Sequence, residues 1–213
     1  NKMADEFNTG LYCDPTPIAV GQDAPEFTME TFEPSSGSFG EVKLSELRND
    51  GKWTVLVFYP ADFTFVCPTE LADLATQDAK LTELGAKIIS VSTDTKFSHL
   101  AWCQSEKLMA DVKYTMGADT TGKVSSLFGV YDENTGLALR GTFIINPESK
   151  LVSSQVNYYN VGRNMEELSR IVEANVHCLA HPAEACPAKW SPGQKTLTPN
   201  EAMVGKVYEA LNR

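Results

Sequence analysis

The chain of 213 residues contains no long apolar run, and no stretch approaches the ~20 residues that a membrane-spanning helix needs. It also lacks the basic start and apolar middle of a secretory signal peptide. Basic residues are few, with 18 Lys and Arg against 28 Asp and Glu. The resulting net charge of −10 argues against binding to a phosphate backbone, which requires clustered cations. We therefore expect a cytoplasmic protein with no membrane or nucleic-acid partner.

The cysteines are odd in number and have no CxxC spacing: Cys13, Cys67, Cys103, Cys178 and Cys186. In a reducing compartment this pattern indicates free thiols, some of them catalytic, and not a framework of structural disulfides. The sequence has no internal repeat or low-complexity tract, and its length suits one domain with an ample core.

The most informative stretch reads WTVLVFYPADFTFVCPTE. Its first part, Trp53 to Tyr59, is an unbroken apolar run typical of a strand buried on both faces, and Pro60 ends it. After Pro68 the apolar residues follow a helical spacing as far as Gly85. Cys67 is therefore expected at or just before a helix N-terminus, which favours the thiolate. The alternative is an inert buried cysteine, but this context favours a nucleophile.

The rest of the chain is expected to alternate strands and helices and to end its sheet with a hairpin. Strands are predicted near 24–30, 86–91, 113–116, 140–146 and 151–158, with a turn at 34–40, and helices near 95–107, 121–128, 164–179 and 201–211. This order predicts an α/β domain with a mixed sheet.

Two motifs carry a resemblance to a known family. The segment PADFTFVCPTE, with Pro60, Thr64 and Cys67, closely resembles the active-site signature of peroxiredoxins. The segment EACPAKW around Cys186 resembles the resolving-cysteine segment of typical 2-Cys peroxiredoxins. The phrases MADVKYTMGADTTG and PGQKTLTPNEAMVGKVYEAL are most similar to the bacterial alkyl hydroperoxide reductase group of that family. The likeness extends from about Ile18 to Leu211.

The resemblance implies a thioredoxin-like fold with a central mixed β-sheet flanked by helices and an extended C-terminal tail. It places the core at about 18–175 and an extension carrying the resolving cysteine at about 176–213. The implied activity is a thiol peroxidase that reduces hydrogen peroxide and organic hydroperoxides in antioxidant defence. Cys67 would attack the peroxide and become a sulfenic acid, and no metal, flavin or haem would be needed.

The resemblance also implies roles for the residues around the thiolate. Thr64 would hydrogen-bond the thiolate and the peroxide oxygen, and Pro60 would shield the site from water. Arg140 would stabilise the anion, and Glu70 and Arg163 would form an ion pair that holds these groups in place. On residue type alone, the alternative for Thr64 is a loop residue bonded to local backbone, and the alternative for Arg140 is an edge residue that reaches solvent.

The partners implied by the family are a second copy of the chain and a reductant. Cys186 of one subunit would form a disulfide with Cys67 of another in an antiparallel homodimer, and dimers would assemble into a ring, a decamer. A dithiol reductant, either a flavoprotein disulfide reductase or thioredoxin, would then restore both thiols.

Other interpretations remain open from the residues. His177, Cys178, His181 and Cys186 lie within ten residues and have a spacing that can bind zinc. A thioredoxin-like disulfide reductase is disfavoured because Cys67 has no partner at the CxxC spacing, and a holdase chaperone role would be secondary. Apart from Cys67 and Cys186, the cysteines are expected to be structural or incidental.

Overall fold

The computed structural model describes residues 16–212. A seven-stranded mixed sheet forms its centre. The strand order is β2 (Ser38–Lys43), β1 (Thr28–Glu33), β5 (Thr115–Ala118), β4 (Ala86–Ser92), β3 (Trp53–Phe58), β8 (Arg140–Ile145) and β9 (Leu151–Asn157). Strands β3, β4 and β5 run parallel to one another, and the other neighbours pair antiparallel. The predicted mixed α/β sheet is confirmed.

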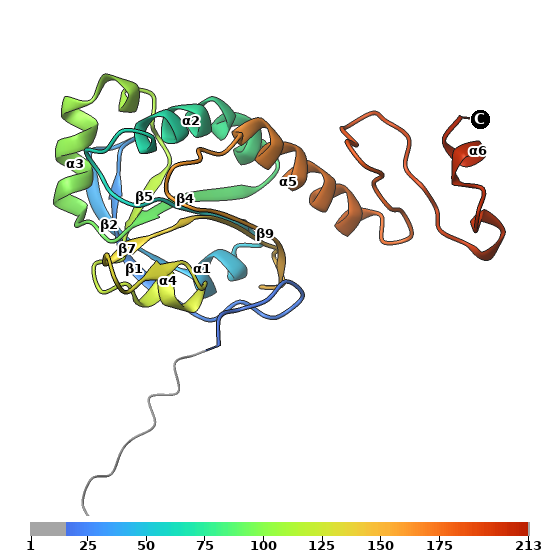
Figure 1. Ribbon diagram of the computed structural model, residues 1–213, viewed down its shortest axis with the longest axis horizontal. Helices are drawn as coiled ribbons and strands as arrows, with labels where there is room; N and C mark the ends of the chain where they lie inside the picture. Colours follow the sequence, from blue (N-terminus) through green and yellow to red (C-terminus); the bar gives the residue numbers. More distant parts are fainter. Residues whose placement is uncertain (1–15, 213) are drawn as a thin grey trace, which may run out of the picture.

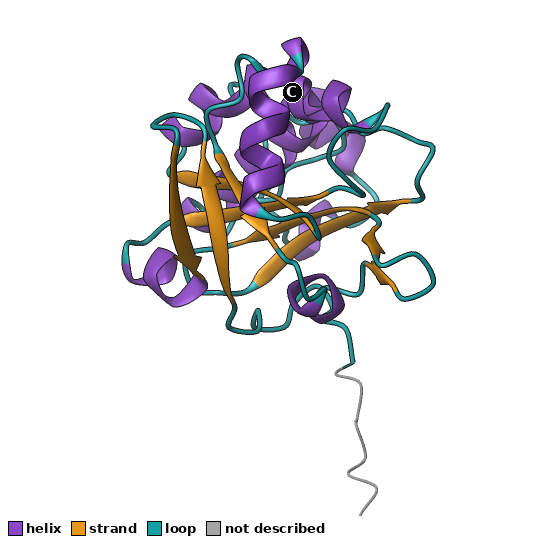
Figure 2. Cartoon of the chain, turned by 90° about the vertical axis from the view of Figure 1, so that its left-hand side faces the viewer, coloured by secondary structure: helices purple, strands orange, loops and turns teal. Residues whose placement is uncertain are grey.

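Helices cover both faces of this sheet (Figures 1 and 2). On one face lie α2 (Cys67–Glu83), α3 (Lys96–Ser105) and α5 (Met165–Ala180), and on the other lie α1 (Leu44–Asn49) and α4 (Lys123–Leu127). Short elements complete the core: the 3-10 helix η1 (Lys107–Met109) and the pair β6 (Tyr131–Asp132) and β7 (Leu137–Ala138).

Strand β3 explains why its sequence is apolar at every position. Val55 and Val57 belong to the core beneath α2 and α5, whereas Leu56 and Phe58 belong to the core on the α1 and α4 side. Successive side chains of a strand point to opposite faces, so a strand covered on both faces needs no polar positions. The chain that leaves β3 is thereby held in the middle of the molecule.

Side-chain caps define where two of the predicted helices begin. Asn164 accepts hydrogen bonds from the N–H groups of Glu166 and Glu167 at the start of α5. Thr95 accepts from the N–H of Ser98 at the start of α3. Both residue types are favoured at this position because the side-chain oxygen satisfies donors that the first turn leaves unpaired. Both helices lie within two residues of their predicted bounds.

Two predicted elements differ from those found. The helix expected at 201–211 is split into η2 (Glu201–Met203) and α6 (Val207–Asn212), because Gly205 adopts a positive φ of 74° between them. The first strand begins at Thr28 and not near 24, and the turn expected at 34–40 is shorter, since β2 already begins at Ser38.

The segment after α5 forms an arm that extends away from the sheet, beyond the end of the helix (Figure 1). We call residues 181–212 the C-terminal arm. Within residues 16–212, no helix is long and apolar enough to span a bilayer.

Candidate active site

Cys67 is the first residue of α2 and is fully buried. The chain reaches it from β3 through Pro60, which is itself buried. Pro68 lies in the first turn of α2, where its missing N–H costs no hydrogen bond, and Val66 offers no capping side chain. The positive end of the helix dipole therefore lies beside the sulfur and favours the thiolate.

Arg140 supplies a second positive charge at this position. It begins β8, the strand that pairs with β3, and its Nη1 lies 3.4 Å from Sγ of Cys67. The same Nη1 donates to Oε2 of Glu70 at 2.7 Å, and Nε donates to the carbonyl of Tyr159 at 2.7 Å. Only 3% of Arg140 is exposed, so the alternative of an edge residue that reaches solvent is excluded.

Glu70 and Arg163 form a buried ion pair joined at two points. Nε and Nη2 of Arg163 donate to the two carboxylate oxygens at 2.8 and 3.0 Å, and the backbone N–H of Arg163 donates at 2.8 Å. Burial alone would raise the pKa of Glu70, but the hydrogen bonds and charges of Arg163 and Arg140 outweigh it and hold that pKa below its ordinary value. Glu70 is therefore ionised at neutral pH and holds both guanidinium groups in position.

Thr64 has a different partner from the one that the resemblance implied. Its hydroxyl donates to the carbonyl of Ala61 at 2.7 Å. A hydroxyl has one proton to donate, so in this arrangement Thr64 is not a donor to the Cys67 sulfur. The arrangement found is the other one that the residue type allowed, a loop threonine bonded to local backbone.

A buried polar network beneath this loop was not predicted from the sequence. Asp62 accepts from the hydroxyl of Tyr59 at 2.7 Å and lies 2.8 Å from Nδ1 of His99. Nε2 of His99 lies 3.1 Å from the carbonyl of Gly117. Burial and the Asp62 carboxylate raise the pKa of Tyr59 well above its ordinary value. Asp62 comes three residues after Tyr59, but no spacing in the sequence pointed to His99, because β4 and α3 bring it there.

The loop itself is anchored on one side and open on the other. Phe63 adopts a positive φ of 58°, which is uncommon for a residue with a side chain, and its ring packs against Trp102 at 6.2 Å between centroids. Phe65, two residues before Cys67, is 91% exposed. The loop therefore links the buried sulfur to the surface.

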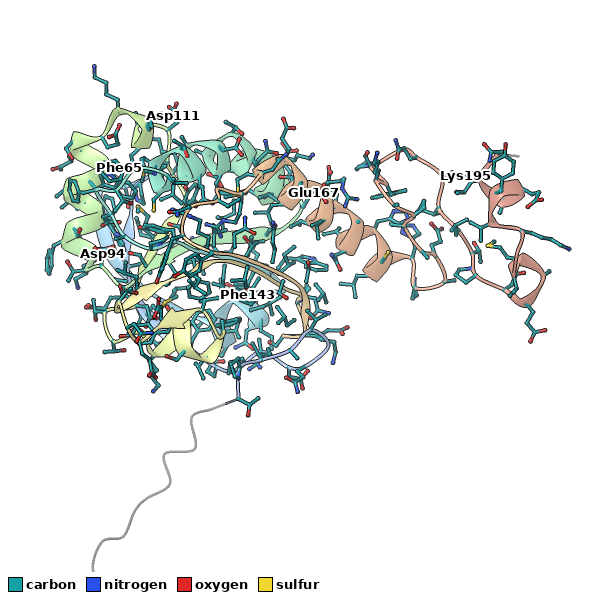
Figure 3. All side chains as sticks on the ribbon, in the orientation of Figure 1. Phe65, Asp94, Asp111, Phe143, Glu167 and Lys195 are labelled. Carbon is teal, nitrogen blue, oxygen red and sulfur yellow. The ribbon has the colours of Figure 1, made fainter. Side chains whose placement is uncertain are left out.

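Cys186 lies on the C-terminal arm, which extends away from the sheet beyond the end of α5 (Figure 1). Figure 3 shows Phe65 near one end and Lys195, of the arm, near the other. Burial and the neighbouring Cys178 and Glu184 raise the pKa of the Cys186 thiol to about 11. The structure therefore does not bring Cys67 and Cys186 of one chain together.

The remaining cysteines differ in their surroundings. The thiol of Cys103 contacts the sulfur of Met116 at 3.5 Å, and burial together with Asp62 raises its pKa to about 11. This environment suits an inert, packed cysteine, as the sequence suggested. Cys178 lies beside Cys186, with 3.6 Å between the sulfurs. Cys13 lies outside the described residues.

The histidines of the possible zinc site have other partners. Nε2 of His177 lies 2.8 Å from Oε2 of Glu184, and the rings of His177 and His181 stack with 4.3 Å between centroids. Among residues 16–212, no three His, Cys, Asp or Glu side chains are grouped so that they could hold a metal ion.

Comparison with known proteins gives consistent results for the core and for the arm. Residues 20–154 match the model of the AhpC/TSA family, and residues 180–208 match the C-terminal domain of 1-Cys peroxiredoxin. The chain is 43% identical to alkyl hydroperoxide reductase C of Staphylococcus aureus over 188 residues, which cover 88% of this chain and 98% of that protein.

Solved structures agree with these matches. A reduced 2-Cys peroxiredoxin of Plasmodium vivax superposes with a TM-score of 0.82 at 32% identity, covering 87% of this chain and 96% of that one. AhpC of Enterococcus faecalis superposes with a TM-score of 0.74 at 38% identity, covering 79% and 98%.

Proposed function

Because the chain belongs to the AhpC/TSA family, has the thioredoxin-like fold of peroxiredoxins and is a thiol-dependent peroxidase, we propose that Cys67 is the residue that attacks the peroxide. The observation that carries this assignment is the position of Arg140. Its guanidinium lies 3.4 Å from the Cys67 sulfur at the N-terminus of α2, so two positive groups favour a thiolate in a buried site.

In the first step, the Cys67 thiolate attacks one oxygen of hydrogen peroxide or of a small organic hydroperoxide. An S–O bond forms, the O–O bond breaks, and water or an alcohol leaves after taking up a proton, so that Cys67 becomes a sulfenic acid. Arg140 stabilises the charge that develops on the oxygens. Pro60 shields the reacting atoms from water, and the Thr64 hydroxyl donates to the peroxide oxygen after it leaves the Ala61 carbonyl.

In the second step, Cys186 of a second subunit condenses with the sulfenic acid and releases water. The separation of the active-site loop and the arm within one chain supports a disulfide between subunits. The partner subunit would pair in an antiparallel homodimer with β9, the last strand of the sheet, at the part of its edge beyond Leu151, because the backbone of Leu151 is hydrogen-bonded to Gly21 and Gln22. Dimers assemble further into a ring, which we propose to be a decamer.

The third step restores both thiols by exchange with a dithiol reductant, either a flavoprotein disulfide reductase or thioredoxin. We place the reaction in the cytoplasm, where the free cysteines would stay reduced between turnovers. We treat residues 176–213 as the extension that presents Cys186 and residues 18–175 as the core.

A non-reducing gel tests these assignments. Pre-reduced wild type, Cys67→Ser and Cys186→Ser are each treated with one equivalent of hydrogen peroxide, and residual peroxide is assayed. In samples quenched within the first seconds, we expect a covalent dimer from wild type, no rapid consumption by Cys67→Ser, and consumption without that dimer by Cys186→Ser. Rapid consumption by Cys67→Ser would overturn the assignment of the attacking residue.

A further inference from the structure

The end of α5 and the C-terminal arm bring together a second pair of cysteines, Cys178 and Cys186, which the proposed cycle does not use as a pair. Cys178 lies in the last turn of α5, and its sulfur is 3.6 Å from the sulfur of Cys186. The Cys186 sulfur also lies 3.9 Å from the carbonyl of Ala174. Two thiols at this distance need only a small movement of their side chains to form a disulfide bond.

Contacts within the arm, and between the arm and α5, keep the sulfurs of Cys178 and Cys186 close together. Ala185 and Leu197 exchange backbone hydrogen bonds of 2.8 and 2.9 Å, which close a loop around Cys186. Trp190 is 3% exposed, and its ring packs against His177, the residue before Cys178, at 4.9 Å between centroids. The closeness of the two sulfurs is therefore a property of the folded arm.

Two polar contacts between α5 and the arm also hold the two sulfurs close together. Nη1 of Arg170 donates to the carbonyl of Trp190 at 3.0 Å, and His177 lies 2.8 Å from the Glu184 carboxylate. These interactions tie the segment on either side of Cys186 to the helix that carries Cys178.

We propose that Cys178 is a third redox-active cysteine, which attacks the Cys186 sulfur of the intersubunit disulfide and leaves a Cys178–Cys186 disulfide within one chain. The proposal rests on the proposed function, because it needs the Cys67–Cys186 disulfide as its substrate.

The step is a thiol–disulfide exchange and needs no further oxidant. The Cys178 thiol gives its proton to solvent, its sulfur forms a bond with Cys186, and the bond between Cys186 and the other subunit's Cys67 breaks. The electron pair of that bond leaves with Cys67 as a thiolate, so one disulfide and one thiol are present before and after.

Two features favour this direction. The better leaving group in such an exchange is the sulfur whose thiolate its surroundings stabilise. Cys67 leaves beside Arg140 and the N-terminus of α2, whereas burial and the neighbouring Cys178 and Glu184 raise the pKa of Cys186 to about 11. A disulfide that includes a stabilised thiolate is also the stronger oxidant, so the equilibrium favours the disulfide of the arm.

The exchange has a functional consequence. Cys67 becomes free to react with a second peroxide before any reductant arrives, while the oxidising equivalent is stored on the arm. The reductant then meets a disulfide at the end of the molecule remote from the active-site loop (Figure 3).

Peroxide titration and peptide mapping test the proposal. Cys13→Ser and Cys103→Ser form the shared background, because these two cysteines lie outside the proposed chemistry. Pre-reduced background protein and the same protein with Cys178→Ser are treated with a small excess of hydrogen peroxide in the presence of dimedone, which traps sulfenic acids. Samples are quenched over time with an alkylating agent, run on a non-reducing gel and digested for mass spectrometry.

We expect the background protein to form the disulfide-linked dimer transiently and then to return to the monomer. It should yield a linked peptide containing Cys178 and Cys186, carry dimedone on Cys67, and consume about two equivalents of peroxide per subunit. The Cys178→Ser protein should stay a linked dimer and consume about one. The linked peptide is read directly from the protein that retains Cys178, so this result does not depend on how the variant folds.

A persistent dimer in the background protein, with Cys178 alkylated and the same peroxide consumption as Cys178→Ser, would overturn the inference and leave the proposed function intact. If neither protein forms the linked dimer, and Cys186 is alkylated throughout, the proposed function itself fails and this inference fails with it.

Discussion

At the scale of single residues, Glu70 connects the two arginines of the buried site, since its carboxylate accepts hydrogen bonds from both. We expect Glu70→Gln to lower the free energy of unfolding by about 3 kcal/mol at neutral pH, because it leaves two buried guanidinium groups without a counter-charge. Urea denaturation of both proteins across a range of pH measures this.

The pH dependence of that difference has a definite sign. The pKa of Glu70 in the folded protein lies below its unfolded value of about 4.3, so the stabilisation is present above that pH and is lost as the pH falls through the folded value. The free energy of unfolding of wild type should therefore fall toward that of Glu70→Gln in acid. Glu83→Gln, at the exposed other end of α2, is the control and should change stability little at any pH. A difference that stays constant into strong acid would contradict the role given to the carboxylate.

Arg140 should act through geometry as well as through charge. Its guanidinium contacts the Cys67 sulfur, Glu70 and the Tyr159 carbonyl together, which an ammonium group cannot reproduce. We expect Arg140→Lys to slow the reaction of Cys67 with hydrogen peroxide by about 100-fold. Stopped-flow measurement of the oxidation under single-turnover conditions gives this rate constant, and circular dichroism checks the fold. A rate within a few-fold of wild type would show that charge alone suffices.

The sequence was informative about these residues only through their motifs. Arg140 and Glu70 are 70 positions apart, and only the pairing of β8 with β3 brings the arginine to the start of α2. The hydroxyl of Thr64 shows the limit of a motif, because a rotatable group takes whichever acceptor the loop offers, here Ala61. Residue types indicated the chemistry of the site, whereas the hydrogen-bond partner of each side chain depended on tertiary packing.

At the scale of elements, the loop between β3 and α2 depends on the buried network of Asp62. We expect Asp62→Ala to lower the free energy of unfolding by about 3 kcal/mol, because Tyr59 and His99 lose their buried partner. It should also slow the reaction of Cys67 by about tenfold, since the loop that positions the sulfur loses its anchor.

Denaturation and stopped-flow oxidation separate these two effects, and Asp111→Ala at an exposed position is the matched control. Lower stability with an unchanged rate would make the network purely structural.

The elements themselves were predictable where periodicity and caps agreed. The buried run of β3 and the amphipathic helix α5 both appear as expected, and the structure adds Asn164 as the cap of α5. The break at Gly205 was missed because the apolar spacing continues across it, and a glycine is compatible with both a helix and a positive φ. The strand order of the sheet could not be predicted from the sequence, because register and pairing are set by contacts between distant segments.

At the scale of the whole molecule, the edge strand and the arm together suggest how two copies meet. Strand β9 ends the sheet, and apolar side chains at and just beyond it are exposed: Val156 by 47%, Tyr158 by 67% and Val161 by 60%. An open edge with such side chains is a template for pairing with another chain. The proposed dimer would cover this surface and bring the arm of one subunit to the active-site loop of the other.

We expect Val156→Glu to weaken this dimer, because a carboxylate would lose its hydration in the interface. The variant should sediment as a smaller species in analytical ultracentrifugation. It should still consume about one equivalent of peroxide, since Cys67 lies within one chain, yet accumulate sulfenic acid in place of the linked dimer. Leu108→Glu, also 47% exposed but on η1, is the matched control and should behave as wild type. A Val156→Glu protein that remains dimeric and forms the linked dimer at the normal rate would place the interface elsewhere on the molecule.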